Sequence, residues 1–103
     1  MIQVKNKEEL QSIFDARPDG KFIIDLYADR CWPCRLLNPI LKQFYDLDTD
    51  YTIIKINTEE AQELTQEYWI TSLPTLHILN WLESNVVKWL IDLDKLKQLT
   101  WTP

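Results

Sequence analysis

Glycine is nearly absent from this sequence, and histidine is equally rare. Gly20 is the single glycine among 103 residues, so the chain has no glycine-rich loop of the kind that cradles phosphate groups. His77 is the single histidine, and no Ser/His/Asp set for nucleophilic catalysis can be assembled around it. We interpret His77 as a neutral imidazole packed in a strand. These shortages argue against nucleotide-binding and hydrolytic sites.

The chain also lacks an excess of basic residues and any long apolar run. It carries 11 Lys and Arg against 16 Asp and Glu, a formal net charge of −5, so nucleic acids and anionic membrane surfaces are unsuitable partners. No apolar stretch approaches the ~20 residues that a membrane span requires. The first residues do not combine a basic segment with an apolar one, as a secretory signal does. We therefore expect a cytoplasmic protein.

A hydrophobic content of 46%, with five tryptophans, is typical of a folded globular chain. The length of 103 residues is enough to bury one core but not two. We therefore expect a single domain over residues 1–103, and a monomer.

The two cysteines stand close together, in Cys31-Trp32-Pro33-Cys34. They follow an apolar run and open a segment with helical periodicity. This spacing lets both sulfur atoms reach disulfide distance across one helical turn, and the helix N-terminus favours a thiolate on Cys31. At the junction of a strand and a helix, the arrangement predicts a redox pair.

Two alternatives to a redox role stay open. A structural staple is a weak use of this spacing, because a four-residue loop gains only about 2 kcal/mol, against roughly 3 for fifteen residues. A zinc site needs a second pair of ligands, and the chain offers no further cysteine and only one histidine. We therefore expect no metal site and no cofactor other than a redox-active disulfide.

A nearly continuous apolar run over residues 22–28 is typical of a central strand that is covered on both faces. Asp25 interrupts this run, and a carboxylate buried there without a partner should have a raised pKa and stay partly protonated. A satisfied structural acid is the ordinary interpretation. Because Asp25 lies six residues before Cys31, on the strand that leads to it, we favour a functional role.

Periodicity and capping residues predict the other elements. We expect strands over residues 2–4, 51–57, 75–79 and about 85–90, the last two forming a hairpin. We expect helices capped by Asn6, Asn57 and Asp92, and one that begins near Cys31. The order β-α-β-α-β-α-β-β-α predicts a three-layer α/β/α sandwich around a central mixed β-sheet.

The helix that begins near Cys31 has the clearest amphipathic pattern in the chain. Its expected apolar face consists of Leu36, Leu37, Ile40, Leu41, Phe44 and Tyr45. Pro39 lies inside this helix and should kink it by removing a backbone hydrogen bond.

Together these residues resemble the thioredoxin family. The motifs that carry the resemblance are Asp25 in Ile-Ile-Asp-Leu-Tyr-Ala, Cys31-x-Pro33-Cys34 followed by Arg35, Pro39, Lys55 in Ile-Ile-Lys-Ile-Asn, and Leu73-Pro74-Thr75. The resemblance covers residues 22–99. It implies the thioredoxin fold and thiol–disulfide oxidoreductase activity.

The family's roles carry over where the residues match. Cys31 would be the exposed nucleophile that attacks a target disulfide, and Cys34 the buried thiol that resolves the mixed disulfide. Asp25, helped by Lys55, would move protons to and from Cys34. Pro74 would form a cis peptide bond, hold the substrate chain beside the disulfide and keep metal ions out of the dithiol.

The sequence departs from the family around the disulfide. Trp32-Pro33 replaces the usual Gly-Pro between the cysteines, and Arg30 replaces the usual tryptophan before them. The family's glycines near the cis-proline loop, in the last hairpin and just after its final strand are missing. Near those positions stand Trp69, Ser72, Trp81 or Leu82, and Trp89 or Leu90. We therefore expect a narrow, apolar substrate groove, lined by Trp32, Pro33, Leu73, Pro74, Trp89 and Leu90. If Trp89 instead turns into the core, the groove is unaffected.

Three functions remain open at this point. A cytosolic protein-disulfide reductase agrees best with the two cysteines, Asp25 and Leu73-Pro74. Its partners would be disulfide-containing proteins and a thioredoxin reductase or an equivalent electron donor. A thioredoxin-fold binding or assembly module with a dedicated partner would use the aromatic surface. A more oxidising disulfide exchange protein is the third, because the residues between the cysteines tune the reduction potential.

Overall fold

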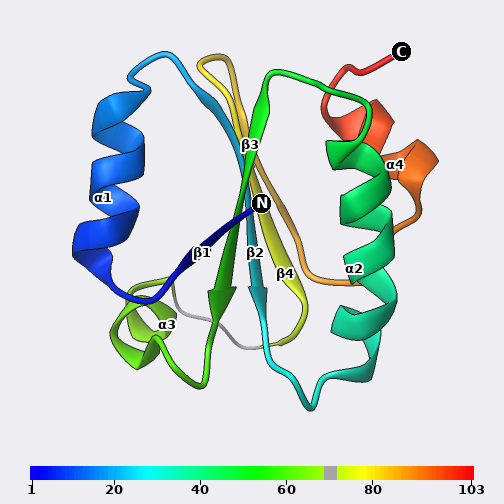
Figure 1. The fold of residues 1–103 in the computed structure, drawn as a ribbon. Coiled ribbons are helices and arrows are strands. Elements are labelled where there is room, and N and C mark those ends of the chain that lie inside the picture. Colours follow the sequence, from blue (N-terminus) through cyan, green and yellow to red (C-terminus); the bar gives the residue numbers. More distant parts are fainter. Residues whose placement is uncertain (69–71) are drawn as a thin grey trace.

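The computed structural model describes residues 1–68 and 72–103, and Figure 1 shows its β-sheet between two groups of helices. The strands are β1 (Ile2–Val4), β2 (Lys21–Tyr27), β3 (Tyr51–Asn57), β4 (Thr75–Leu79) and β5 (Ser84–Val87). The helices are α1 (Lys7–Ala16), α2 (Trp32–Tyr45), α3 (Gln62–Glu67) and α4 (Leu93–Leu99). Because α1 and α3 lie on one face of the sheet and α2 and α4 on the other, the expected three-layer sandwich is confirmed.

The sheet is mixed, with the strand order β1-β3-β2-β4-β5. β1 and β2 both run parallel to β3, whereas β4 is antiparallel to β2 and β5 is antiparallel to β4. β2 therefore has a neighbour on each edge and a helical layer on each face. A residue in the middle of β2, such as Asp25, is removed from water on every side.

Alternate residues of the strands supply two separate apolar cores. The core under α2 and α4 contains Ile23, Leu37, Leu41, Phe44, Ile53, Leu76, Ile78, Val87, Ile91 and Leu96. The core under α1 and α3 contains Val4, Leu10, Phe22, Ile24, Leu26, Ile54, Ile56, Ala61 and Leu64. The two lists interleave along β2 because successive side chains of a strand point to opposite faces.

The predicted helix caps are confirmed at Asn6 and Asp92, and the third predicted cap, at Asn57, is wrong. Oδ1 of Asn6 accepts a hydrogen bond from the Glu9 amide at 2.8 Å, and Oδ1 of Asp92 accepts one from the Lys95 amide at 2.8 Å. Asn57 does not cap α3. It is the last residue of β3, and its side chain accepts from the Glu59 amide at 3.0 Å, so it stabilises a turn that precedes the helix.

The apolar face of α2 is narrower than expected. Leu36 and Tyr45 are 44% and 50% exposed, so their assignment to the buried face was wrong. The fully buried stripe follows Leu37, Leu41 and Phe44, whose spacing of four and three residues keeps them over the sheet. Pro39 lies inside α2 without ending it.

The hairpin strand β5 is shorter than expected, since it ends at Val87 and leaves Trp89 and Leu90 beyond the sheet. His77 is half-buried with its ring 4.9 Å from the Tyr68 ring, and desolvation together with the charge of Lys88 lowers its pKa. It is therefore a packed neutral imidazole, as predicted.

The single glycine occupies a tight turn before β2. A Cβ atom on Gly20 would lie 2.6 Å from the Phe22 ring and 2.9 Å from the Arg17 carbonyl oxygen, so a larger residue would force its neighbours apart. Of the positions expected to replace family glycines, Trp69 lies outside the described residues.

Candidate functional site

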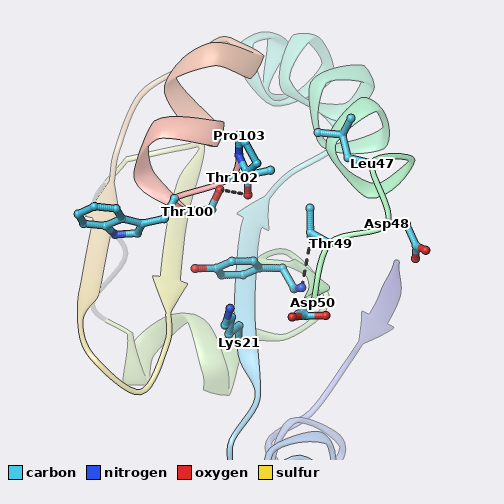
Figure 2. A pocket seen from close by; sticks show the side chains of 10 residues that line it. Lys21, Leu47, Asp48, Thr49, Asp50, Thr100, Thr102 and Pro103 are labelled. Carbon is cyan, nitrogen blue, oxygen red and sulfur yellow. Dashed lines mark hydrogen bonds between the residues drawn. The ribbon is translucent and has the colours of Figure 1, made fainter.

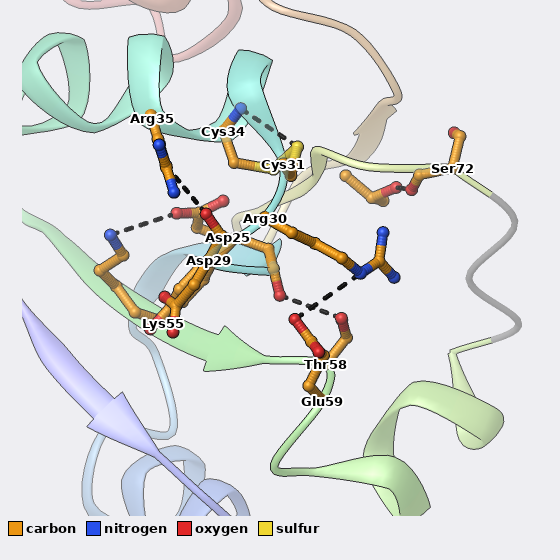
Figure 3. The surroundings of a disulfide bond; sticks show 12 residues. Asp25, Asp29, Arg30, Cys31, Cys34, Arg35, Lys55, Thr58, Glu59 and Ser72 are labelled. Carbon is orange, nitrogen blue, oxygen red and sulfur yellow. Dashed lines mark hydrogen bonds and ion pairs between the residues drawn. A yellow bond between two sulfur atoms is a disulfide. The ribbon is translucent and has the colours of Figure 1, made fainter.

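The two cysteines form a disulfide where β2 passes into α2 (Figure 3). Cys31 is the N-cap of α2, and its Sγ accepts a hydrogen bond from the Cys34 amide at 3.2 Å. Its carbonyl oxygen accepts from the Arg35 amide at 3.2 Å. The Cys31 sulfur therefore lies against the positive end of a 14-residue helix, which favours a negative charge on it when the disulfide is reduced.

Both cysteines are nearly buried in the disulfide form. Cys31 is 8% exposed and Cys34 6%, so the expected contrast between an exposed and a buried cysteine is wrong for this state. The reason is that Tyr27 and Leu73 pack against the small cluster that the cysteines form with Ala28.

The segment before β4 lies beside this cluster. The peptide bond between Leu73 and Pro74 is cis, and the hydroxyl of Thr75 donates a hydrogen bond to the Ser72 carbonyl oxygen at 2.8 Å. Because Leu73 contacts the cysteine cluster, the cis-proline segment forms one wall beside the disulfide.

Asp25 and Lys55 are opposite one another in the register of β2 and β3, on the face covered by α2. Nζ of Lys55 lies 3.6 Å from Oδ2 of Asp25 (Figure 3). Asp25 is only 2% exposed, and its Oδ1 has no hydrogen-bond partner among the described residues. Burial raises the pKa of Asp25 to about 6, against a smaller lowering by Lys55. The burial and the raised pKa of Asp25 that the sequence predicts are confirmed.

Two residues that the sequence reasoning missed complete the surroundings of Lys55. Its Nζ donates a hydrogen bond to Oδ1 of Asn38 and lies 4.6 Å from the centre of the Tyr27 ring. The periodicity could have found both residues. Asn38 is one helical turn after Cys34, and Tyr27 is two strand residues after Asp25, on the same face.

A cavity of about 330 Å³ lies between these groups. Its lining consists of Tyr27, Ala28, Asp29, Cys34, Arg35, Asn38 and Lys55. The cavity thus brings Cys34 and Lys55 to one space, and Lys55 is the residue that pairs with Asp25.

Three of the large apolar side chains that are expected to line the substrate groove are exposed. Trp32 is 64% exposed, Trp89 61% and Leu90 38%. The alternative that Trp89 turns into the core is therefore wrong. Arg30, in the place of the family's tryptophan, forms an exposed ion pair with Glu59 at 3.7 Å, a kind of pair that contributes little to stability.

A second cavity, of about 390 Å³, lies at the opposite end of the sheet (Figure 2). Lys21 and Tyr51, the first residues of β2 and β3, line it together with Trp101 and the last residues of the chain. It is separate from the disulfide, which follows the other end of β2.

Within residues 1–68 and 72–103, no group of three or more His, Cys, Asp or Glu side chains is arranged to hold a metal ion. No helix in this part of the chain is long and apolar enough to cross a membrane.

The chain is similar to known proteins in both its sequence and its fold. The thioredoxin family matches residues 1–99. A thioredoxin from Mycoplasmoides gallisepticum is 34% identical over 76 residues, which are 74% of each of the two chains. A mutant thioredoxin from Halobacterium salinarum is 30% identical, with a TM-score of 0.83 over 99% of this chain and 90% of that one. The thioredoxin of Fasciola hepatica superimposes over the full length of both chains with a TM-score of 0.87, and at 15% identity it supports the fold alone.

Proposed function

The chain belongs to the thioredoxin family and is a thiol–disulfide oxidoreductase with a redox cysteine pair, and on this premise we propose that it is a cytoplasmic protein-disulfide reductase. The observation that carries the proposal is the Cys31–Cys34 disulfide at the start of α2, with Asp25 buried in the neighbouring strand. Its substrates would be proteins with accessible disulfides. A thioredoxin reductase or an equivalent donor would restore the two thiols.

The reaction begins with both cysteines reduced. The Cys31 thiolate attacks one sulfur of the target disulfide, which breaks that bond, forms a mixed disulfide and releases the target's other sulfur as a thiolate. Cys34 then gives its proton to Asp25 and attacks the Cys31 sulfur. The mixed disulfide breaks, the second target thiolate leaves and takes up a proton, and Cys31–Cys34 is oxidised. Two electrons pass from the protein to the target.

The pKa of Asp25 suits this proton transfer. A general base works best when its pKa is near the working pH, and burial raises the pKa of Asp25 to about 6. An ordinary exposed aspartate, with a pKa near 3.9, would be a much weaker base.

The target chain would bind along the rim of the disulfide. The contacts would come from Trp32, Pro33, Leu73, Pro74, Trp89 and Leu90. Two exposed indole rings, of Trp32 and Trp89, would make this surface apolar and narrow its approach, which would restrict the range of targets.

Reduction of insulin disulfides with a chemical electron donor tests the proposal. The wild-type protein should reduce insulin, and Cys31→Ser should abolish the activity. Cys34→Ser should instead accumulate a mixed disulfide with the target, because the resolving thiol is gone. Absence of reduction by the wild-type protein, or of a trapped complex with Cys34→Ser, would reject this function.

The reduction potential distinguishes the reductase from a more oxidising exchange protein. Equilibration with glutathione should give a value near −270 mV, as for thioredoxin, and a value near −120 mV would identify an oxidant.

A dedicated binding module is the remaining candidate, favoured by the exposure of Trp81 and Trp101, at 71% and 80%. Such a module would keep its function when both cysteines are changed to serine, whereas a reductase would not.

A further inference from the structure

The ammonium group of Lys55 is the cation closest to the buried Asp25 carboxylate, yet other groups hold it. Nζ donates a hydrogen bond to Oδ1 of Asn38, while its separation from Oδ2 of Asp25 is 3.6 Å. A charge-assisted hydrogen bond to a carboxylate would measure about 2.7–2.9 Å. The face of the Tyr27 ring, 4.6 Å away, adds a cation–π attraction. Asn38 and Tyr27 therefore compete with Asp25 for the same cation.

The fold gives Asn38 this position. It lies one helical turn after Cys34 in α2, and α2 packs over the face of the sheet from which Asp25 and Lys55 project. Asn38 is exposed at the outer side of the cavity, whereas Asp25 is buried within the sheet. A hydrogen bond to Asn38 consequently draws the lysine tail outward, away from the carboxylate.

Few other charges act on Asp25. From β4, the residue opposite in register is the apolar Leu76. From α2, Cys34 and Arg35 line the cavity. Cys34 is in the disulfide and carries no charge, and the Arg35 guanidinium donates a hydrogen bond to the Asp29 carbonyl oxygen at 2.8 Å. Among the described residues, Lys55 is the one charged group that shifts the Asp25 titration. The location of its ammonium group therefore controls the electrostatic environment of Asp25.

We propose that Asn38 is a positioning residue, whose side-chain amide holds Lys55 and prevents its ammonium group from closing onto the Asp25 carboxylate. Loss of the amide lets Lys55 move into direct hydrogen-bond contact with Asp25. With an effective dielectric constant of about 20, shortening the separation by roughly 0.8 Å would lower the Asp25 titration midpoint by about half a unit to one unit. Asn38 would thus keep Asp25 able to accept a proton near neutral pH.

The test is a direct titration of Asp25 by the ¹³C chemical shift of its carboxyl carbon, in the full-length disulfide form. Asn38→Leu is the main variant, because leucine has a similar volume, favours a helix and offers no acceptor. The midpoint should fall by about half a unit to one unit relative to wild type. Asn38→Ala, the second variant if leucine disturbs the fold, should shift the midpoint in the same direction.

A double variant isolates the part played by Lys55. Lys55→Met alone should raise the midpoint, and adding Asn38→Leu to it should cause no further change. If Asn38→Leu leaves the wild-type midpoint unmoved, the proposal is overturned. It is also overturned if the shift persists in the Lys55→Met background, since the change would then come from hydration and not from the lysine.

The consequence for activity rests on the proposed function and is measured separately. The rate at which the mixed disulfide is resolved is measured by stopped flow as a function of pH. In Asn38→Leu, the acid limb of this rate profile should be displaced by the same amount as the Asp25 titration. If the carbon titration moves and the rate profile does not, the positioning of Lys55 stands and Asp25 is not the proton acceptor of Cys34. If insulin reduction fails in the wild type, the titration experiment still decides the role of Asn38.

Discussion

Replacement of Asp25 by alanine should stabilise the protein at neutral and alkaline pH. Burial raises the pKa of Asp25 from 3.8 to about 6, and the Oδ1 atom has no hydrogen-bond partner among the described residues. The folded state therefore binds a proton at this site more tightly than the unfolded state does. Between about pH 4 and pH 6 the folded protein carries the extra proton, so the free energy of unfolding falls as the pH rises through this window. Above about pH 6, Asp25 is ionised in both states, and its ionisation no longer changes the free energy of unfolding.

The magnitude follows from the size of the shift. A pKa raised by about two units corresponds to about 3 kcal/mol of lost stability once the carboxylate is ionised, at about 1.36 kcal/mol per unit. Alanine removes this loss, but leaves a small cavity that costs about 1 kcal/mol at every pH. Asp25→Ala should therefore be about 1–2 kcal/mol more stable than wild type at pH 8, and about 1 kcal/mol less stable at pH 4.

Urea denaturation of the disulfide forms at pH 4, 5, 6, 7 and 8 measures this difference. The pH-dependent part is diagnostic, because the cavity contributes equally at each pH. Asp25→Asn, which keeps the side-chain shape, should show the same rise of the difference with pH. A difference that stays flat, or that falls as the pH rises, would refute the reasoning, since a falling difference means that the pair with Lys55 stabilises the ionised carboxylate. Unchanged turnover in Asp25→Ala, together with lower denaturation midpoints, would make Asp25 an ordinary structural acid.

Three further predictions concern the site and the fold. In the reduced protein, Cys31 should react with iodoacetamide with a midpoint well below the value of about 8.5 for a free thiol, while Cys34 resists; a midpoint at or above that value contradicts the effect of the helix N-terminus. Trp32→Gly and Trp89→Gly should each speed insulin reduction by opening the rim, and equal or slower rates in both would indicate a general reductase with unusual packing. Asp92→Ala, which removes the α4 cap, should lower the free energy of unfolding by about 1 kcal/mol, and an unchanged urea midpoint would show that the cap contributes nothing.

The sequence by itself predicted the features that depend on residues close together along the chain. The alternation of strand and helix patterns predicted the three-layer sandwich, and the caps at Asn6 and Asp92 were correct because a cap is a contact over three residues. The disulfide also follows from local spacing. Asp25 could be recognised as buried and perturbed because a single carboxylate interrupts an apolar strand, which requires no knowledge of what packs against it.

Only the tertiary structure decided which distant residues meet. Asn57 fits the pattern of a helix cap, but the end of β3 places it in a turn. Leu36 continues an apolar period, yet it lies beside the buried stripe of α2 and is 44% exposed. The contact between Asn38 and Lys55 joins a helix to a strand 17 residues further along the chain. Local patterns state which face of an element is apolar, whereas the position of α2 over β2 and β3 results from packing the whole core, and that position sets the surroundings of Asp25.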